Sequence, residues 1–386
     1  MQEVYIHAAA RTPMGGLQGA LSGRTAPELG GVAIRAALDR AGSGPDSPDA
    51  LFMGCVLPAG LGQAPARQAG FAAGLPSGLP ATTLNKMCGS GMQAVMMAAD
   101  AIRAGSAGIV VAGGMESMSN APYLLPKMRS GARLGHGQVI DHMFLDGLED
   151  AYDKGRLMGT FAEDCATEFA FTREAQDAYA LASLSRATDA IRSGAFSAEI
   201  APVTIPSRGG DVVVDLDEQP GNARPDKIPH LKPAFRKDGT VTAANSSSIS
   251  DGAAALIVGA DSGGAIARIV GYASHAQEPG QFPTAPVPAA EKLLQKIGWD
   301  KASVDLWEVN EAFAVVPMAF MARLGLDHDR VNVNGGACAL GHPIGASGAR
   351  IIVTLIHALR ARGGSRGVAA ICIGGGEGTA LAVEIV

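Results

Sequence analysis

Two stretches of the chain repeat one pattern of apolar and polar positions. Each opens with a turn of small residues, continues with apolar side chains at helical spacing, and ends in a short, wholly apolar strand followed by glycines. The first copy covers residues 88–117 and the second covers residues 345–378. A strand that is apolar on both faces is typical of a sheet covered by helices on both sides. The pattern therefore predicts two similar halves, each mixed α/β.

The two halves are separated by a segment of different texture. Strand-like stretches near the N-terminus (VYIHAAARTPMG) and from residue 267 (ARIVGYASHA) each enter a half, whereas residues 119–243 are richer in charge, Pro and Gly and include an amphipathic helix at 172–192. We predict an N-terminal half made of residues 1–118 and 244–264, an inserted loop domain at 119–243, and a C-terminal half at 265–386.

Composition removes several classes of protein. The 386 residues are 47% hydrophobic and 18% charged, with a net charge of −6, which disfavours general binding to nucleic acid or to an anionic membrane. The first ten residues lack a basic region followed by an apolar core, and no run approaches eighteen apolar residues, so we expect a soluble, cytoplasmic protein. Five cysteines without a CxxC pair indicate reduced thiols and suggest neither a disulfide framework nor a zinc site.

Cys88 is the first candidate for chemistry. It follows the strand-like PATTL and begins the turn Cys-Gly-Ser-Gly ahead of a predicted helix. A thiol at a helix N-terminus feels the positive end of the helix dipole, which favours the thiolate and its nucleophilicity. A buried, inert cysteine that packs as a small hydrophobe is the alternative, and the local pattern leaves both open.

Three further residues are candidates in the C-terminal half. His342 lies in GHPIGASG before the second helix, at nearly the repeat position of Cys88, so a pseudo-two-fold axis would bring it to the same site as a general base. Cys372 ends the strand VAAIC before three glycines, and Asn310 lies in VNEAF. Packing for Cys372, and capping of a helix for His342 or Asn310, are the alternatives.

A competing motif is G-x-G-x-x-A at residues 89–94, as in dinucleotide-binding folds. The next strand, GIVVAGG, lacks an acidic residue at its end for a ribose, and Glu116 comes several residues late. An oxidoreductase is therefore disfavoured.

Five motifs together resemble the thiolase family, in the family's order and over essentially the whole chain: NKMCGSGMQAV, GGMESMS, NEAFA, NVNGGACALGHPIGASGAR and CIGGGEG. The resemblance implies a thiolase fold, with two βαβαβαββ halves in a five-layered αβαβα core and an inserted loop domain. It also implies an acetyl-CoA C-acyltransferase that forms or cleaves 3-oxoacyl-CoA by a ping-pong route. A ketosynthase-like decarboxylating enzyme would normally carry His in place of Cys372. A catalytically inactive scaffold would have lost at least one of the four candidates.

The resemblance assigns a role to each candidate. It makes Cys88 the nucleophile that is acylated, His342 its base, and Cys372 the second acid/base. Asn310 would hold a water that, with His342, stabilises the enolate, and the backbone amides of Cys88 and Gly374 would form the oxyanion hole. No metal or prosthetic group is implied, because coenzyme A acts as substrate and carrier.

The resemblance also implies substrate contacts and an assembly. Ser247 would contact the pantetheine arm, Phe235 and Phe313 would line the tunnel, and Met158 would lie near the acyl end. Leu157 stands where acetoacetyl-CoA thiolases commonly have His, and Phe282 stands where they often have Met, so the acyl pocket departs from that subgroup. We expect acetoacetyl-CoA as the favoured substrate, with a medium- or long-chain 3-ketoacyl-CoA thiolase of fatty-acid β-oxidation as the alternative. Residues 123–142 resemble a loop that pairs dimers into tetramers, with a solvated surface loop as the alternative; we expect a homo-oligomer, at least a dimer.

Overall fold

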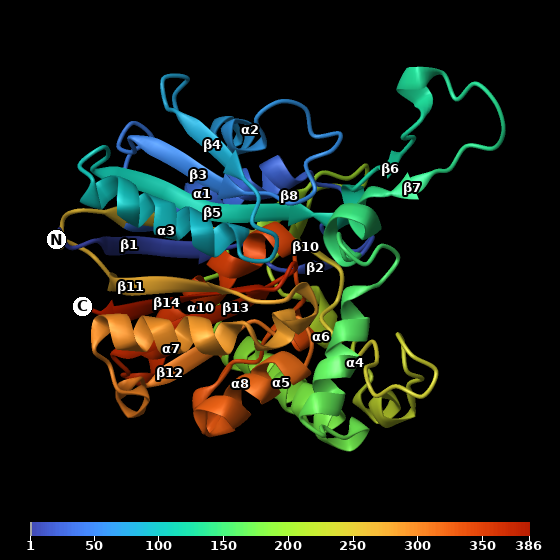
Figure 1. Cartoon of the computed structure of the whole chain (residues 1–386). Coiled ribbons are helices and arrows are strands. Elements are labelled where there is room, and N and C mark those ends of the chain that lie inside the picture. Colours follow the sequence, from blue (N-terminus) through green and yellow to red (C-terminus); the bar gives the residue numbers. More distant parts are fainter. Residues whose placement is uncertain (1) are drawn as a thin grey trace.

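The computed structural model describes residues 2–386, and its largest feature is a ten-stranded mixed sheet (Figure 1). Nine strands follow the order β12-β13-β14-β11-β1-β10-β5-β3-β4, and β2 (Gly15–Gly16) pairs with β10 beside them. The elements of the N-terminal half are β1 (Tyr5–Arg11), α1 (Ala26–Ala41), β3 (Ala50–Gly54), α2 (Pro65–Ala72), β4 (Ala81–Leu84), α3 (Ser90–Arg103), β5 (Ile109–Ser117) and β10 (Ser250–Gly259).

The C-terminal half repeats this arrangement. Its elements are β11 (Ala267–Ala276), α7 (Pro286–Ile297), β12 (Leu306–Val309), α8 (Val315–Leu324), α9 (Ala337–Leu340), α10 (Ile344–Arg362), β13 (Arg366–Ile373) and β14 (Glu377–Ile385). In each half an antiparallel pair (β1–β10, β11–β14) is followed by a second antiparallel pair (β10–β5, β14–β13) and then by a parallel one (β5–β3, β13–β12). The repeat predicted at residues 88–117 and 345–378 is therefore confirmed as α3–β5 and α10–β13–β14.

The intervening segment contributes short strands and helices beside the sheet. They are β6 (Tyr123–Leu124), β7 (Ile140–Asp141), α4 (Met158–Glu168), α5 (Arg173–Ser193), β8 (Val203–Ile205), β9 (Val212–Val214) and α6 (Glu218–Asn222). The helix expected at 172–192 is α5, whose N-cap Thr172 accepts a hydrogen bond from the Ala175 amide at 3.2 Å. The division of the chain at residues 119 and 243 stays a prediction.

The helices form three layers around the two halves of the sheet. β1 pairs with β11 through only two residue pairs at its start, so the two halves of the sheet are joined at one place. α3 and α10 lie between them, α1 and α2 cover the outer side of the N-terminal half, and α7 and α8 cover that of the C-terminal half (Figure 1). The result is the five-layered αβαβα arrangement expected from the sequence.

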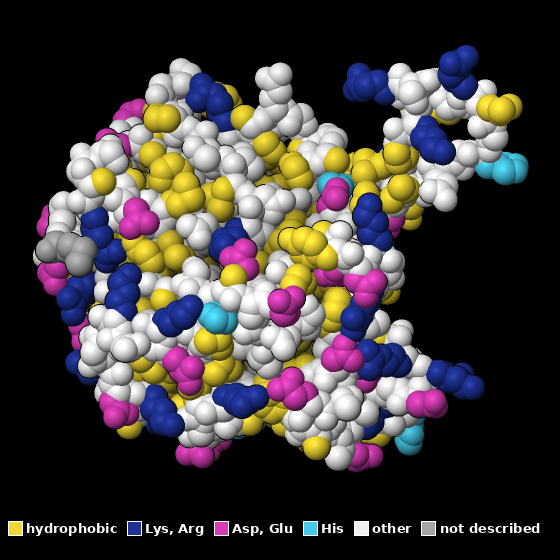
Figure 2. Space-filling model, viewed as in Figure 1, with side chains coloured by type: hydrophobic (Ala, Val, Ile, Leu, Met, Phe, Trp, Pro, Cys, Tyr) yellow, Lys and Arg dark blue, Asp and Glu magenta, His cyan; other side chains and the backbone are white. Residues whose placement is uncertain are grey.

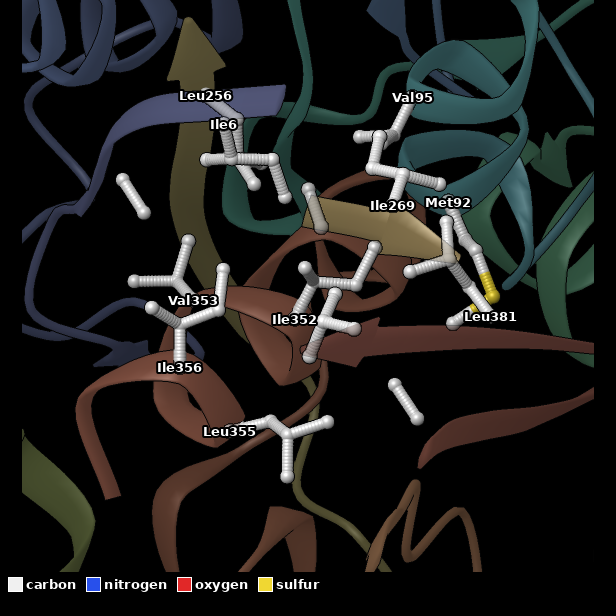
Figure 3. Packing of buried hydrophobic residues seen from close by; sticks show 14 of the residues in the cluster. Ile6, Met92, Val95, Leu256, Ile269, Ile352, Val353, Leu355, Ile356 and Leu381 are labelled. Carbon is white, nitrogen blue, oxygen red and sulfur yellow. The ribbon is translucent and has the colours of Figure 1, made fainter. Parts of the chain in front are cut away.

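The middle layer is the most deeply buried part of the molecule. Figure 3 shows Val95 of α3 and Ile352 of α10 packed among side chains from both halves of the sheet, including Leu256 of β10 and Leu381 of β14. Within the described residues, α10 alone is long and apolar enough to cross a membrane, but 83% of its apolar window is buried inside the protein. Its apolar character is therefore explained by its place between two sheets.

One strand of the repeat is missing from the C-terminal half. Where the N-terminal half has β4, this half has only an isolated bridge between Trp307 and Val331. The next residue, Asn332, has a positive φ of 49°, and its side-chain amide takes over the pairing: it accepts from the Val309 nitrogen at 2.7 Å and donates to the Val309 oxygen at 2.8 Å. A side chain thus satisfies the backbone of β12 where the strand is interrupted.

Candidate active site

Cys88 lies in a tight loop between β4 and α3. Met87 has a φ of 46°, a left-handed conformation that is uncommon for a residue with a side chain. The loop is held by Ser90, whose hydroxyl accepts from the Lys86 nitrogen at 2.8 Å and donates to the Met87 oxygen at 2.7 Å. The Asn85 side chain accepts from the Met87 nitrogen at 2.9 Å. These contacts fix the backbone on both sides of the strained residue and so hold Cys88 in place.

The first turns of α3 and α10 touch each other. A β-carbon placed on Gly348 would lie 2.5 Å from the Met92 nitrogen and 3.3 Å from the Cys88 oxygen. One placed on Gly91 would lie 2.6 Å from the Ala349 nitrogen. Only glycine allows the two helices to approach this closely. The predicted meeting of the two helix starts is therefore present.

His342 is buried just ahead of α10, and its ring has a defined tautomer. The Ser347 hydroxyl donates its single proton to the Pro343 oxygen at 2.9 Å, so at 2.5 Å from the ring it accepts from Nδ1–H of His342. The other ring nitrogen, Nε2, is buried and has no hydrogen-bond partner among residues 2–386. An unprotonated imidazole nitrogen without a partner is a suitable proton acceptor.

The pKa values of the two groups have opposite shifts. Burial raises the pKa of Cys88 to about 11, although the backbone N–H groups of Gly374 and of Cys88 itself lower it. Burial also lowers the pKa of His342 to about 3, and the charge of Arg350 lowers it further. The backbone N–H of Cys88 at the helix start favours the thiolate, as expected, but burial outweighs this contribution and the thiol is protonated in the free protein. A neutral base must remove the thiol proton during reaction.

Cys372 is the penultimate residue of β13, and the loop after this strand approaches Cys88. Burial raises the pKa of Cys372, and the nearby Cys88 thiol raises it further. A β-carbon on Gly89 would lie 2.5 Å from the Ile373 side chain, and the Gly374 amide is directed at the Cys88 sulfur. Lys86 and Glu377 form an ion pair across the same junction. The two cysteines and the amides of Cys88 and Gly374 are thus brought together from opposite halves.

Asn310 follows β12 and is completely buried. Its backbone nitrogen donates to the Ala370 oxygen of β13 at 3.0 Å, whereas neither atom of its side-chain amide has a hydrogen-bond partner within the described chain. It does not cap a helix, because α8 begins only at Val315. A buried primary amide without partners is costly, so this group is suited to binding a water or a ligand atom.

The predicted substrate residues gather beside Cys372 in one hydrophobic cluster. Ring centroids are 5.9 Å apart for Phe235 and Phe313 and 6.5 Å apart for Phe282 and Phe313. The sulfur of Met158 lies 3.7 Å from the position of a β-carbon on Gly374. Phe282 is only 3% exposed, so it supports the Phe313 ring from behind and is not an open surface.

Ser247 lies next to this aromatic cluster. Its nitrogen donates to the Ala312 oxygen at 3.0 Å, and the preceding Ser246 forms an isolated bridge with Phe313. The backbone contacts therefore hold residues 246–247 against the loop that follows Asn310. All ten residues singled out in the sequence lie in this one region. They are Cys88 itself, residues in the loops at His342, Asn310 and Cys372, and residues in or next to the adjoining aromatic cluster.

Sequence reasoning missed two buried carboxylates beside the site. Glu116, considered only as a ribose ligand, accepts hydrogen bonds from backbone nitrogens at the start of α10 and after β3. Glu311 accepts from Tyr179, Ser183 and Asn332. An acidic residue directly after an apolar strand was the available signal, because a buried carboxylate requires several donors.

Comparison with known proteins agrees with this arrangement. The model of the thiolase N-terminal domain matches residues 4–262, and that of the thiolase C-terminal domain matches residues 264–385. The chain belongs to the thiolase family.

Two curated relatives match over nearly their whole length. The acetyl-CoA acetyltransferase of Pseudomonas aeruginosa is 50% identical over 99% of each chain, and that of Cupriavidus necator is 49% identical over 100% of each. Among solved structures, the Bacillus anthracis acetyl-CoA acetyltransferase superposes with a TM-score of 0.97 at 42% identity, covering 100% of this chain and 99% of that one. The Acat5 thiolase of Ascaris suum in complex with coenzyme A gives 0.94 at 44% identity, with both chains fully covered.

Proposed function

We propose that the protein is an acetyl-CoA acetyltransferase, which joins two molecules of acetyl-CoA into acetoacetyl-CoA and CoA and also catalyses the reverse thiolysis. The observation that carries this proposal is that Cys88 and Cys372 come together from opposite halves, while His342 lies directly ahead of α10, the helix whose first turn touches that of α3. Full-length relatives that are about 50% identical and named acetyl-CoA acetyltransferase support this substrate over longer acyl chains.

The first half-reaction acylates Cys88. Nε2 of His342 takes the thiol proton, and the sulfur attacks a carbonyl carbon to form a tetrahedral oxyanion. In synthesis this is the thioester carbonyl of acetyl-CoA, whose CoA sulfur leaves with the proton from His342. In thiolysis it is the 3-oxo carbonyl of the 3-oxoacyl-CoA. The amides of Cys88 and Gly374, which are directed at the sulfur, donate to this oxyanion. In thiolysis, the carbon–carbon bond then breaks and the enolate of acetyl-CoA leaves.

The second pair of groups handles that enolate. Cys372 protonates the departing carbon in thiolysis and removes a proton from the methyl group of acetyl-CoA in synthesis. The free amide of Asn310, together with His342, stabilises the enolate oxygen through a water. A second thiol or carbanion finally attacks the acyl-Cys88 thioester. We include no metal or prosthetic group in this scheme, because the thioester itself acidifies the carbon; residues 2–386 contain no group of three His, Cys, Asp or Glu side chains placed to bind a metal.

The proposal is tested by a thiolysis assay with Cys88→Ala. We expect a loss of at least about a thousandfold in kcat, because no other group replaces the nucleophile. Cys165→Ala is the matched control, since it removes a buried thiol of α4 that packs in the same hydrophobic cluster as Cys372 but is not one of the reacting groups. An active Cys88→Ala enzyme would end the proposal.

Chain length is tested by the same assay across 3-oxoacyl-CoA substrates from four carbons upward. Packing of Phe313 against Phe235 and Phe282 supports a short acyl group, so we expect activity on acetoacetyl-CoA. A strict preference for long chains would favour a thiolase of fatty-acid breakdown instead.

We also propose a homotetramer, assembled from dimers and located in the cytoplasm. The segment from β6 to β7 extends away from the body (Figure 1), and its tip carries exposed apolar and basic side chains (Figure 2). Tyr123, Leu134 and Val139 are each more than 60% exposed, which supports burial against another copy. Replacing residues 126–138 by a short turn should convert tetramers into dimers in light scattering; an unchanged assembly would show that this segment is a surface loop.

A further inference from the structure

Glu116 is a fully buried carboxylate near the end of β5. Both of its oxygens accept hydrogen bonds from the backbone of segments distant in sequence. Oε2 accepts from the Val56 nitrogen and the Gly345 nitrogen, each at 2.9 Å. Oε1 accepts from the Leu57 nitrogen at 3.1 Å and lies 3.6 Å from the Cys55 sulfur. One side chain therefore ties the loop after β3 to the first turn of α10.

This first turn of α10 is where the position of His342 is set. Gly345 is three residues beyond His342, and the His342 nitrogen itself donates to the Ser248 oxygen at 3.1 Å. The segment is thus anchored on one side by Ser248 and on the other by Glu116. A β-carbon on Gly345 would lie 2.8 Å from Oε2 of Glu116 and 3.0 Å from the Cys55 α-carbon, so the turn is seated directly against the ends of β3 and β5.

We propose that Glu116 is a positioning residue for the base of the reaction: by holding the Gly345 amide it fixes the His342 ring at the distance from Cys88 that proton transfer requires. This inference rests on the proposed function. The positioning role explains why a carboxylate occupies this buried place, since a buried charge is costly and is retained only where its hydrogen bonds are needed.

Two consequences of removing Glu116 have opposite signs, which makes the proposal testable. Burial raises the pKa of Glu116 to about 7, so the group is mostly ionised at pH 8. Its charge raises the pKa of Cys88 and that of the neighbouring Cys55. Loss of the charge alone would therefore make the Cys88 thiolate easier to form, whereas loss of the anchor would remove the assistance of His342.

The experiment measures alkylation of Cys88 by iodoacetamide at pH 8, quantified by mass spectrometry on the Cys88 peptide. Glu116→Gln keeps the shape of the side chain but turns one acceptor into a donor, and we expect alkylation to slow about tenfold to a hundredfold, as for a misplaced catalytic group. In a His342→Ala background the same substitution should no longer slow alkylation, because the group through which the anchor acts is gone; only the faster reaction that follows from loss of the charge should remain.

A second variant keeps the charge. Glu116→Asp is one methylene shorter and cannot reach both loops, so we expect alkylation to slow as it does for Glu116→Gln. Asp49→Asn is the matched control, because Asp49 makes the same kind of contact at the other end of β5, accepting from the Gly108 and Ile109 nitrogens. It should leave Cys88 alkylation unchanged.

Each alternative has its own result. Faster alkylation in Glu116→Gln, wild-type behaviour of Glu116→Asp, or equal effects with and without His342 would overturn the positioning role. A thiolysis assay on the wild-type enzyme separates this from the proposed function. Absence of thiolysis would end the function while leaving the alkylation result intact, and normal thiolysis in both Glu116 variants would end the positioning role alone.

Discussion

At the scale of single residues, Ser347 decides which nitrogen of His342 can act. Its hydroxyl has one proton, which goes to the Pro343 oxygen, and its oxygen is left to accept from Nδ1–H of the ring. The Cys88 thiol, whose pKa is about 11, is then faced with a neutral base whose pKa is about 3. Such a pair exchanges a proton only when a substrate stabilises the charges that form, so orientation of the ring has a large effect on rate.

Ser347→Ala removes the acceptor for Nδ1–H and leaves the rest of the turn intact. We expect kcat for thiolysis to fall about tenfold, the equivalent of one buried hydrogen bond of about 1.4 kcal/mol, with KM little changed. Ser303→Ala, which removes a hydroxyl bonded to the Asp300 oxygen far from the site, should be neutral. An unchanged kcat in Ser347→Ala would show that the ring is oriented by packing alone.

Sequence patterns could single out the side chains that the fold brings together, but not their electrostatic state. The turn after PATTL and the GHP loop identified Cys88 and His342 because glycine-rich turns before helices are visible as patterns. The helix position of Cys88 favours the thiolate, but its net pKa also depends on burial, which the local sequence pattern does not show. Glu116 was missed for the same reason: its donors are 60 and 229 residues away in the sequence.

At the scale of elements, the site depends on the contact between α3 and α10. The two halves of the sheet can pack against one pair of central helices only if those helices approach closely. Gly91 and Gly348 allow this approach because they have no β-carbon at the contact. The periodicity of both helices was readable in the sequence, and so was the repeat. The end of the pairing after Val331 was not, because VNVNGG alternates like a strand and only the positive φ of Asn332 ends the pairing with β12.

Gly348→Ala should therefore destabilise the fold. The added β-carbon would lie 2.5 Å from backbone and 3.0 Å from the Met92 β-carbon, so we expect a loss of about 1–3 kcal/mol in the free energy of unfolding despite the better helix propensity of alanine. Gly78→Ala is the control, because no atom lies within 4 Å of its β-carbon position. Urea denaturation of both variants provides the measurement. Equal midpoints would mean that the helices separate at little cost.

At the scale of the whole molecule, buried charges connect parts that are distant in sequence. Arg11 at the end of β1 pairs with Glu199 at 2.5 Å and with Asp217 at 2.7 Å, and all three side chains are almost completely buried. This ties residues 199–217 to the sheet. The duplicated halves could be predicted from apolar periodicity, and the five layers from the resemblance to thiolases, but contacts spanning 188 and 206 residues leave no local pattern that predicts them.

Buried ionisable groups also set how stability changes with pH. Burial raises the pKa of Glu116 to about 7 and that of Glu308 to about 8, the latter despite its pairing with Arg350. Both values lie above those of the unfolded chain. The contribution of these two groups to the free energy of unfolding is therefore fully present below pH 4.5 and is lost as the pH rises to 8. His342 and His328 have pKa values lowered to about 3 and about 4, so their contribution is complete above pH 6.5 and is lost on acidification.

Between pH 6.5 and 8 the histidines become neutral in the unfolded chain as well, so their opposing contribution fades and the two glutamates dominate among these four groups. We therefore expect the free energy of unfolding, measured by urea denaturation, to fall over this interval. The fall should be about 1.4 kcal/mol per pH unit for each glutamate that is still protonated in the folded protein.

Glu116→Gln removes the group with the lower pKa. The free energy of unfolding of this variant should therefore fall less steeply than that of the wild type from pH 6 to 7, and in parallel with it above pH 7.5. The control is Asp49→Asn, which changes an exposed carboxylate and should retain the wild-type slope from pH 6 to 8. A wild-type urea midpoint that rises from pH 6.5 to 8 would contradict this prediction. Glu116 and Glu308 would then be ionised in the folded protein over the whole interval, because their hydrogen bonds outweigh the desolvation that raises both pKa values.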